Sequence, residues 1–152
     1  MSNTSKIIVN LQNKVIHSFL KDGKKKTGEK IFLRSLKLLQ KQTKKSYINL
    51  IKRALVVAAP VFKVNQVELK KGKRKTIRSI PIFIANKSSR IMLTLKALKQ
   101  FSSKAINTNI FYQSFAQEIL NSASGKSKSV EQKVSTHKQT LMNKRYLAKF
   151  RW

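Results

Sequence analysis

The chain has 152 residues, and its 34 lysines and arginines outnumber 5 aspartates and glutamates so far that the formal net charge is +29. Scattered carboxylates, two distant histidines and no cysteine exclude disulfides and leave no visible catalytic or metal-binding constellation, so we expect a single domain over residues 1–152 with no enzymatic activity, metal or cofactor. Because self-repulsion of this size destabilises a compact chain, we expect an external polyanion as the partner.

The N-terminal part of the chain predicts two helices joined by a basic turn. Apolar residues recur at helical spacing over residues 8–20, and the turn signal Asp22-Gly23 ends this first helix. A second helix is expected from about Thr27 to residue 41, with Thr27 as its N-cap and Glu29 in its positively polarised first turn.

A third helix is predicted from Ser46 to Ala58, and Pro60 closes it. The residues expected on the buried faces of these first three helices are Ile8, Leu11, Val15, Phe19, Phe32, Leu36, Leu39, Tyr47, Leu50, Ile51, Ala54 and Leu55. A bundle of amphipathic helices is the architecture that such faces favour.

The periodicity then changes to that of strands. Alternating apolar residues on both sides of a basic turn, at 62–64 and 80–84, predict a two-stranded antiparallel β-ribbon over about residues 61–85, inserted between the third and fourth helices. Gly72 is expected at its tip, and Pro81 indicates an edge position because proline cannot donate to the ladder. A two-stranded ribbon is only marginally stable alone, so it must lean on helices or on a partner.

Helical spacing returns from Ser88 and predicts three more helices, the fifth capped by Thr108 and the sixth starting near Ser129. Phe111 and Phe115 are expected in the core, and Glu29 and Glu118 on helix surfaces. The expected inner face of the last helix consists of Val130, Val134, His137, Leu141 and Met142. The predicted fold class is therefore mainly α: a bundle of about six helices with one protruding two-stranded antiparallel β-ribbon.

Three basic clusters lie at the first turn, at the ribbon tip and at the chain end. A lysine run is usually a solvated surface, but here the balancing acids are missing, which favours contacts with phosphates and, among polyanions, with the irregular backbone of folded RNA. The candidate RNA-binding residues are Lys24, Lys25, Lys26, Lys70, Lys71, Lys73, Arg74, Lys75, Arg78, Arg90, Lys138, Lys144, Arg145, Lys149, Arg151 and Trp152. Trp152 could stack on a base or pack against the protein, and the sequence does not separate these alternatives.

Four short motifs occur in the order found in one known family. The stretch from Asp22 to Glu29 resembles an Asp-Gly-Lys-Lys turn between the first two helices of that family, and Ile80-Pro81-Ile82 resembles its second ribbon strand. The segments Thr136-His137-Lys138 and Ala148-Lys149-Phe150-Arg151-Trp152 together resemble its closing Ala-His-Tyr-Arg-Trp motif. The chain thus resembles bacterial-type small-subunit ribosomal protein seven in a divergent form.

The resemblance implies a structural constituent of the small ribosomal subunit head that takes part in translation. Such a protein binds the 3′ major domain of small-subunit rRNA and supports head assembly, and its ribbon lies near the exit-site tRNA, the mRNA path and the eleventh small-subunit protein. The resemblance implies no small-molecule substrate and no membrane partner.

Departures from the family pattern point to an organelle. The basic N-terminal arm is short, and the Arg-Arg-Val-Gly-Gly tip is replaced by residues 68–72, Glu-Leu-Lys-Lys-Gly. Together with lysine enrichment and the lack of a transit-peptide pattern, this favours an organelle-encoded protein bound to ribosomes in the mitochondrial matrix, with plastid or bacterial cytoplasm as the alternative.

Three other classes of protein fit the sequence less well. A histone-like architectural nucleic-acid-binding protein would need an intercalating residue at its ribbon tip, and the tip has glycine and lysine instead. A membrane-surface protein would need a basic amphipathic helix with aromatic anchors, for which only KRYLAKFRW qualifies. An enzyme has no visible constellation of polar groups.

Overall fold

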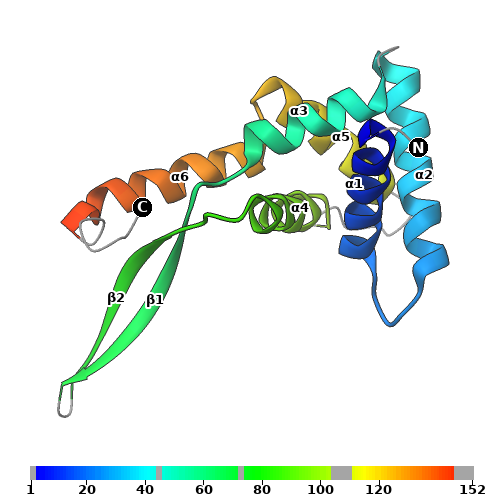
Figure 1. Ribbon diagram of the computed structural model, residues 1–152. Helices are drawn as coiled ribbons and strands as arrows, with labels where there is room; N and C mark the ends of the chain where they lie inside the picture. Colours follow the sequence, from blue (N-terminus) through cyan, green and yellow to red (C-terminus); the bar gives the residue numbers. More distant parts are fainter. Residues whose placement is uncertain (1–2, 44–45, 72–73, 104–110, 146–152) are drawn as a thin grey trace.

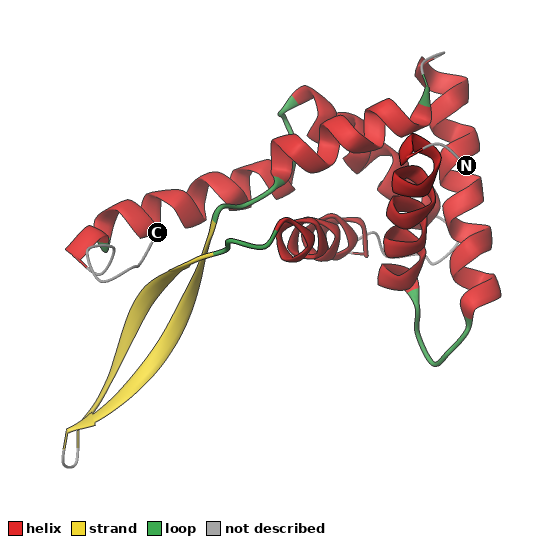
Figure 2. Cartoon of the chain, in the orientation of Figure 1, coloured by secondary structure: helices red, strands yellow, loops and turns green. Residues whose placement is uncertain are grey.

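The computed structural model describes residues 3–43, 46–71, 74–103 and 111–145. The elements are α1 (Asn3–Phe19), α2 (Lys25–Thr43), α3 (Tyr47–Ala58), β1 (Phe62–Lys71), β2 (Arg74–Phe83), α4 (Lys87–Ser103), α5 (Phe111–Ser124) and α6 (Lys128–Met142). Figures 1 and 2 show a helical body from which the β-ribbon and the far part of α6 protrude at one end. This arrangement confirms the predicted fold class and the position of the ribbon between the third and fourth helices.

The core lies within the helical body, where α5 packs against α2, α3 and α4. Leu39 is fully buried, and Phe115 packs edge-on against Phe19 with ring centroids 4.8 Å apart. The buried apolar cluster consists of Val15, Phe19, Phe32, Leu36, Leu39, Ile51, Ala54, Leu55, Leu95, Leu98, Phe115, Ala116, Ile119 and Ala123. The predicted inner faces of α2 and α3 are thus largely confirmed, as is the core position of Phe115, and Phe111 packs against the cluster; the Ile8 side chain lies outside the described residues.

The predicted inner face of α6 is wrong in most of its positions. Val134, Leu141 and Met142 are 46%, 67% and 85% exposed. The side of α6 that faces the rest of the protein is instead polar; its residues are Ser129, Lys133, Thr136, His137 and Thr140. The reason is spatial: α6 runs past the end of the body, as Figure 1 shows, so within the described part of the chain its far part has no body helix beside it.

The base of the ribbon leans on α6, as a two-stranded ribbon requires. The antiparallel register pairs Phe62 with Phe83 and Val64 with Pro81. The ring of Phe62 contacts that of Phe83 at 5.8 Å and the imidazole of His137 on α6 at 6.0 Å, both edge-on. Pro81 is fully buried there. The ribbon therefore leaves the body in a direction that α6 helps to set.

Two further expectations, about Thr27 and Glu118, are also corrected. Thr27 is not the N-cap of α2, because the helix begins two residues earlier and the Thr27 hydroxyl donates to the carbonyl of Lys24 at 2.6 Å within the first turn. Glu118 is not a surface charge: it is 9% exposed, and its Oε1 accepts a hydrogen bond from the backbone N–H of Ser129 at 3.3 Å. A carboxylate suits the positive N-terminus of α6. The predicted cap Thr108 lies outside the described residues.

Candidate nucleic-acid interface

The turn between α1 and α2 presents three exposed lysines, Lys24, Lys25 and Lys26. Asp22 and Gly23 have φ angles of +54° and +71°, so the chain reverses in the left-handed region that glycine adopts at no cost. Lys25 lies 3.8 Å from Glu29, and the remaining charge of the turn faces solvent. Because the amides of a helix N-terminus also favour anions, the turn is suited to a phosphate.

The outer end of the ribbon concentrates charge through its register. The backbones of Lys70 and Lys75 are paired, as are those of Lys71 and Arg74. Like charges directly opposite each other destabilise a strand pair, so this end of the ribbon favours a polyanion. The side chains of these four residues and the whole of Lys73 lie outside the described part of the chain. Arg78 lies closer to the base and is exposed.

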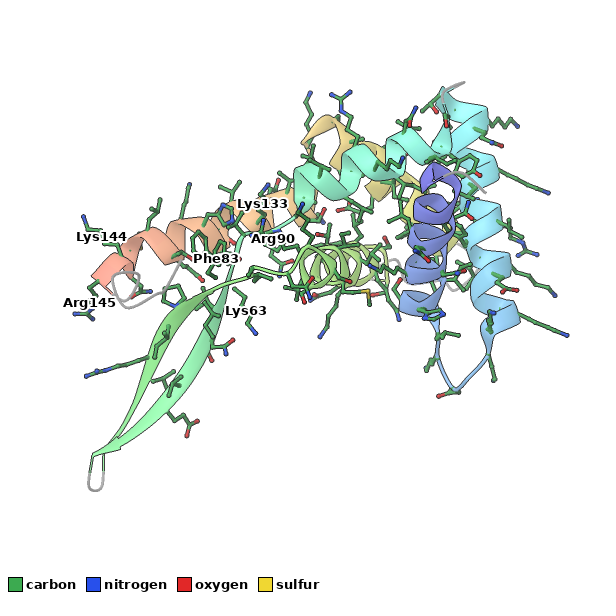
Figure 3. The ribbon with its side chains drawn as sticks, viewed as in Figure 1. Lys63, Phe83, Arg90, Lys133, Lys144 and Arg145 are labelled. Atoms are coloured by element: carbon green, nitrogen blue, oxygen red, sulfur yellow. The ribbon has the colours of Figure 1, made fainter. Side chains whose placement is uncertain are left out.

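The C-terminal cluster lies at the far end of α6. Lys138 is exposed on the helix, and Figure 3 shows Lys144 and Arg145 just beyond it. The predicted contacts of Lys149, Arg151 and Trp152 fall outside the described residues. This cluster and the ribbon are at the same end of the molecule, whereas the turn is at the opposite end of the body (Figure 1).

Arg90 has a structural contact that the sequence did not predict. Its Nε donates to the carbonyl of Ile84 at 2.6 Å, and its guanidinium lies 5.3 Å from the centroid of the Phe83 ring. These contacts join the end of β2 to α4, and Figure 3 shows both side chains at this junction. Arg90 therefore orients the ribbon, whether or not it also reaches a phosphate.

A groove between the ribbon base, α4 and the end of α1 brings together cations that sequence reasoning missed. It has a volume of about 870 Å³, and Lys63, Lys96 and Lys99 line it. The Lys99 ammonium donates to the carbonyl of Ser18 at 2.7 Å, and that of Lys14 donates to Ser88 Oγ at 2.8 Å beside the groove. We call this the basic groove. The spacing of Lys96 and Lys99 could have indicated one helix face, but only the fold brings Lys63 beside them.

A second groove runs between α6, α4 and the other side of β1. It has a volume of about 460 Å³, and Lys63 and Lys96 line it as well, so the two grooves meet at these lysines. Four glutamines line it: Gln66, Gln100, Gln132 and Gln139. We call this the glutamine groove.

Two contacts hold α6 over the glutamine groove. The Lys133 ammonium donates to the carbonyl of Val57 at 2.7 Å, and the backbone N–H of Val61 donates to His137 Nε2 at 3.4 Å. Burial, and secondarily the positive charge of Lys133, lower the pKa of His137 below its ordinary value. The neutral ring is the form that can accept from Val61, so His137 has a structural role, which fits its expected place on the inner face of the last helix.

The described residues offer little to other kinds of site. Among them, no three His, Asp or Glu side chains gather closely enough to hold a metal ion. No helix in these ranges has the length and apolar character needed to cross a membrane. What the structure does bring together is lysines and carboxamides along α4 and the ribbon base.

The similarity of this chain to a known protein family is consistent with a surface rich in lysines and carboxamides. The family model described as Ribosomal protein S7p/S5e matches residues 2–144. The match covers the helical body, the ribbon, the basic groove and α6.

Proposed function

Because the chain belongs to the ribosomal protein S7p/S5e family, we propose that it is a structural constituent of the small-subunit head that binds the 3′ major domain of small-subunit rRNA. Membership itself supports a structural ribosomal protein of the small subunit that acts in translation. The finer proposal adds the rRNA domain, a role in head assembly and the residues that make the contacts.

The observation that carries this proposal is the arrangement of its cations. The Lys24–Lys26 turn and the ribbon extend from the same side of the body at its two ends, and α4 lies between them (Figure 1). The basic groove with Lys63, Lys96 and Lys99 occupies the intervening surface at the ribbon base. Separated points of positive charge on one side of a rigid body suit a folded RNA, whose helices and junctions present phosphates at several places.

The remaining details rest on the family resemblance. The whole chain forms one ribosomal domain, and its ribbon approaches the exit-site tRNA, the mRNA path and the eleventh small-subunit protein. Lysine enrichment and the altered tip at residues 68–72 support a mitochondrial ribosome as its location. We expect the chain to sediment with mitochondrial small subunits and to be released from them only at high salt. Co-sedimentation with plastid or bacterial subunits would instead assign the protein to that location.

The RNA contacts are tested by replacing Lys24, Lys25 and Lys26 together with alanine. If each lysine neutralises one phosphate, the affinity for a 3′ major domain transcript falls about tenfold to a hundredfold near physiological salt, and the log–log salt slope becomes less negative by about 2 to 3. Electrophoretic mobility shift at four salt concentrations measures both quantities.

The matched control replaces Lys37, Lys41 and Lys52, which are exposed on α2 and α3 and line neither groove. If the control variant loses as much affinity as the turn variant and its salt slope flattens equally, the turn lysines contribute only nonspecific electrostatic attraction to RNA. Equal affinity of the wild-type chain for duplex DNA and for the transcript would favour a histone-like architectural protein instead.

A further inference from the structure

We propose that the glutamine groove is a nucleobase-binding site, which receives one unpaired RNA base while the adjoining phosphates lie on Lys63 and Lys96. The inference rests on the proposed rRNA binding and adds to it a place where the protein reads a base. The ligand class is an extruded nucleotide of structured RNA.

The composition of the groove fits a base better than a phosphate. Gln66 comes from β1, Gln100 from α4, and Gln132 and Gln139 from α6. Each carboxamide offers both hydrogen-bond donors and an acceptor, which is the combination that base edges require. None of the four forms a side-chain hydrogen bond with another residue in the described ranges, and all four are exposed, so their polar groups are available.

The groove also offers apolar lining residues and is of suitable extent. Val64, Leu93 and Ala97 line it together with the glutamines. Single-stranded bases are bound by stacking a flat face on such a surface and by hydrogen bonding the exposed edge. A volume of about 460 Å³ is within the range of about 300–1,000 Å³ that small-ligand sites occupy.

The connection to the basic groove supports RNA over a protein segment. Lys63 and Lys96 line both grooves, so they stand where the two meet. An RNA backbone that follows the cations of the basic groove reaches these two lysines, and its next nucleotide is then at the mouth of the glutamine groove. Among the described residues no carboxylate lines the groove, so none of them repels the phosphate that must accompany the base.

The walls of the groove are fixed before any ligand arrives. The Lys133 contact with Val57 and the His137 contact with Val61 hold α6 against the junction of α3 and β1. Arg90 similarly fixes the end of β2 against α4. Because both walls are held in place, binding a base requires little ordering of the protein.

The test combines affinity measurement with chemical probing of small-subunit rRNA from the same source. The full chain is compared with the variant Gln66→Ala/Gln132→Ala; dimethyl sulfate for adenine and cytosine, and a water-soluble carbodiimide for uracil and guanine, report which Watson–Crick edges the protein covers. We expect the variant to bind about fivefold to a hundredfold more weakly, with an unchanged salt slope, and to lose protection of at least one unpaired base. An unchanged slope is the mark of a base contact, because loss of a phosphate contact flattens it.

Two further variants sharpen the result. Gln40→Ala/Gln117→Ala removes two exposed glutamines on α2 and α5 that line neither groove, and it should bind and protect as wild type. Lys63→Gln/Lys96→Gln should instead weaken binding and flatten the slope. Helical circular dichroism verifies that each variant is folded.

The outcomes separate the two proposals. Wild-type affinity and wild-type protection in Gln66→Ala/Gln132→Ala would overturn the base site and leave rRNA binding intact. Unchanged rRNA binding with reduced incorporation into subunits would also overturn it, because the occupant would then be a protein. Failure of the wild-type chain to bind the rRNA would remove the proposed rRNA contact together with this site.

Discussion

The helical body and the protruding arm, which consists of the ribbon and α6, are stabilised in different ways. The body, α1 to α5, buries a continuous apolar cluster in which Leu39 is 0% and Phe115 1% exposed. The arm has a polar inner face on α6, which is held in place by the hydrogen bond that Lys133 donates to Val57 and the one that His137 accepts from Val61, and it leaves Val134 and Leu141 exposed. The body is therefore stabilised mainly by apolar burial, whereas the arm relies more on a few polar and ring contacts with the body.

The largest expected effect tests this contrast with a matched pair of leucines. Leu39→Ala creates a cavity in the body and should lower the free energy of unfolding by about 2–5 kcal/mol. Leu141→Ala removes the same atoms from an exposed site on the arm and should change it by less than about 0.5 kcal/mol. Urea unfolding of both variants measures the difference. Similar losses for the two would mean that α6 buries Leu141 in the free protein, and the contrast would fail.

A smaller effect is expected at the joint between body and arm. Glu118→Ala leaves the Ser129 N–H without its carboxylate acceptor and should cost about 1–3 kcal/mol. Hydrogen exchange should show that α6 opens more readily while α2 and α3 keep their protection. The control Glu131→Ala removes an exposed acid from the first turn of α6 and should cost less than about 1 kcal/mol. Loss of protection throughout the body would mean that Glu118 stabilises the whole body and does not act mainly on α6.

The smallest expected effect is a pH dependence of the arm. The pKa of His137 is lowered by burial and by Lys133, so the folded state binds this proton less tightly than the unfolded state does. Its contribution to stability is complete above the unfolded pKa of about 6.5 and declines as the pH falls through the lower folded pKa. His137→Gln keeps an acceptor for Val61 and should remove this decline. Urea midpoints between about pH 7.5 and 5 measure it; the same decline in both proteins would assign the titration elsewhere.

Local signals in the sequence predicted the body well. The apolar periods of α2 and α3 and the turn at Asp22-Gly23 depend on neighbouring residues, so they predict helices and a reversal without knowledge of the fold. The same reasoning failed for α6, because periodicity shows that a helix has an apolar side but cannot show that the helix runs past its neighbours. The buried position of Glu118 was missed for a related reason: its partner, Ser129, belongs to another helix.

The candidate interface also has a part that the sequence predicted and a part that only the fold reveals. Runs such as Lys24–Lys26 are visible as local charge, and the structure finds them exposed. Lys63, Lys96 and Lys99 are isolated in the sequence, and only the placement of the ribbon base beside α4 gathers them into the basic groove. The four glutamines of the second groove come from three elements and carry no charge, so no pattern in the chain marks them.

Within the residues that the structure describes, the sheet of the ribbon consists of two strands, so each has one side of its backbone without a neighbouring strand. Unprotected strands of this kind tend to recruit copies of themselves into aggregates and fibrils, and lysine is among the residues by which natural proteins prevent this. The paired cations at Lys70–Lys75 and Lys71–Arg74 thus have a second consequence: repulsion between ribbons should keep newly made chains apart until assembly. High salt screens this repulsion, and a polyanion too short to bind the rest of the protein neutralises it. Either condition should make the free protein prone to precipitate.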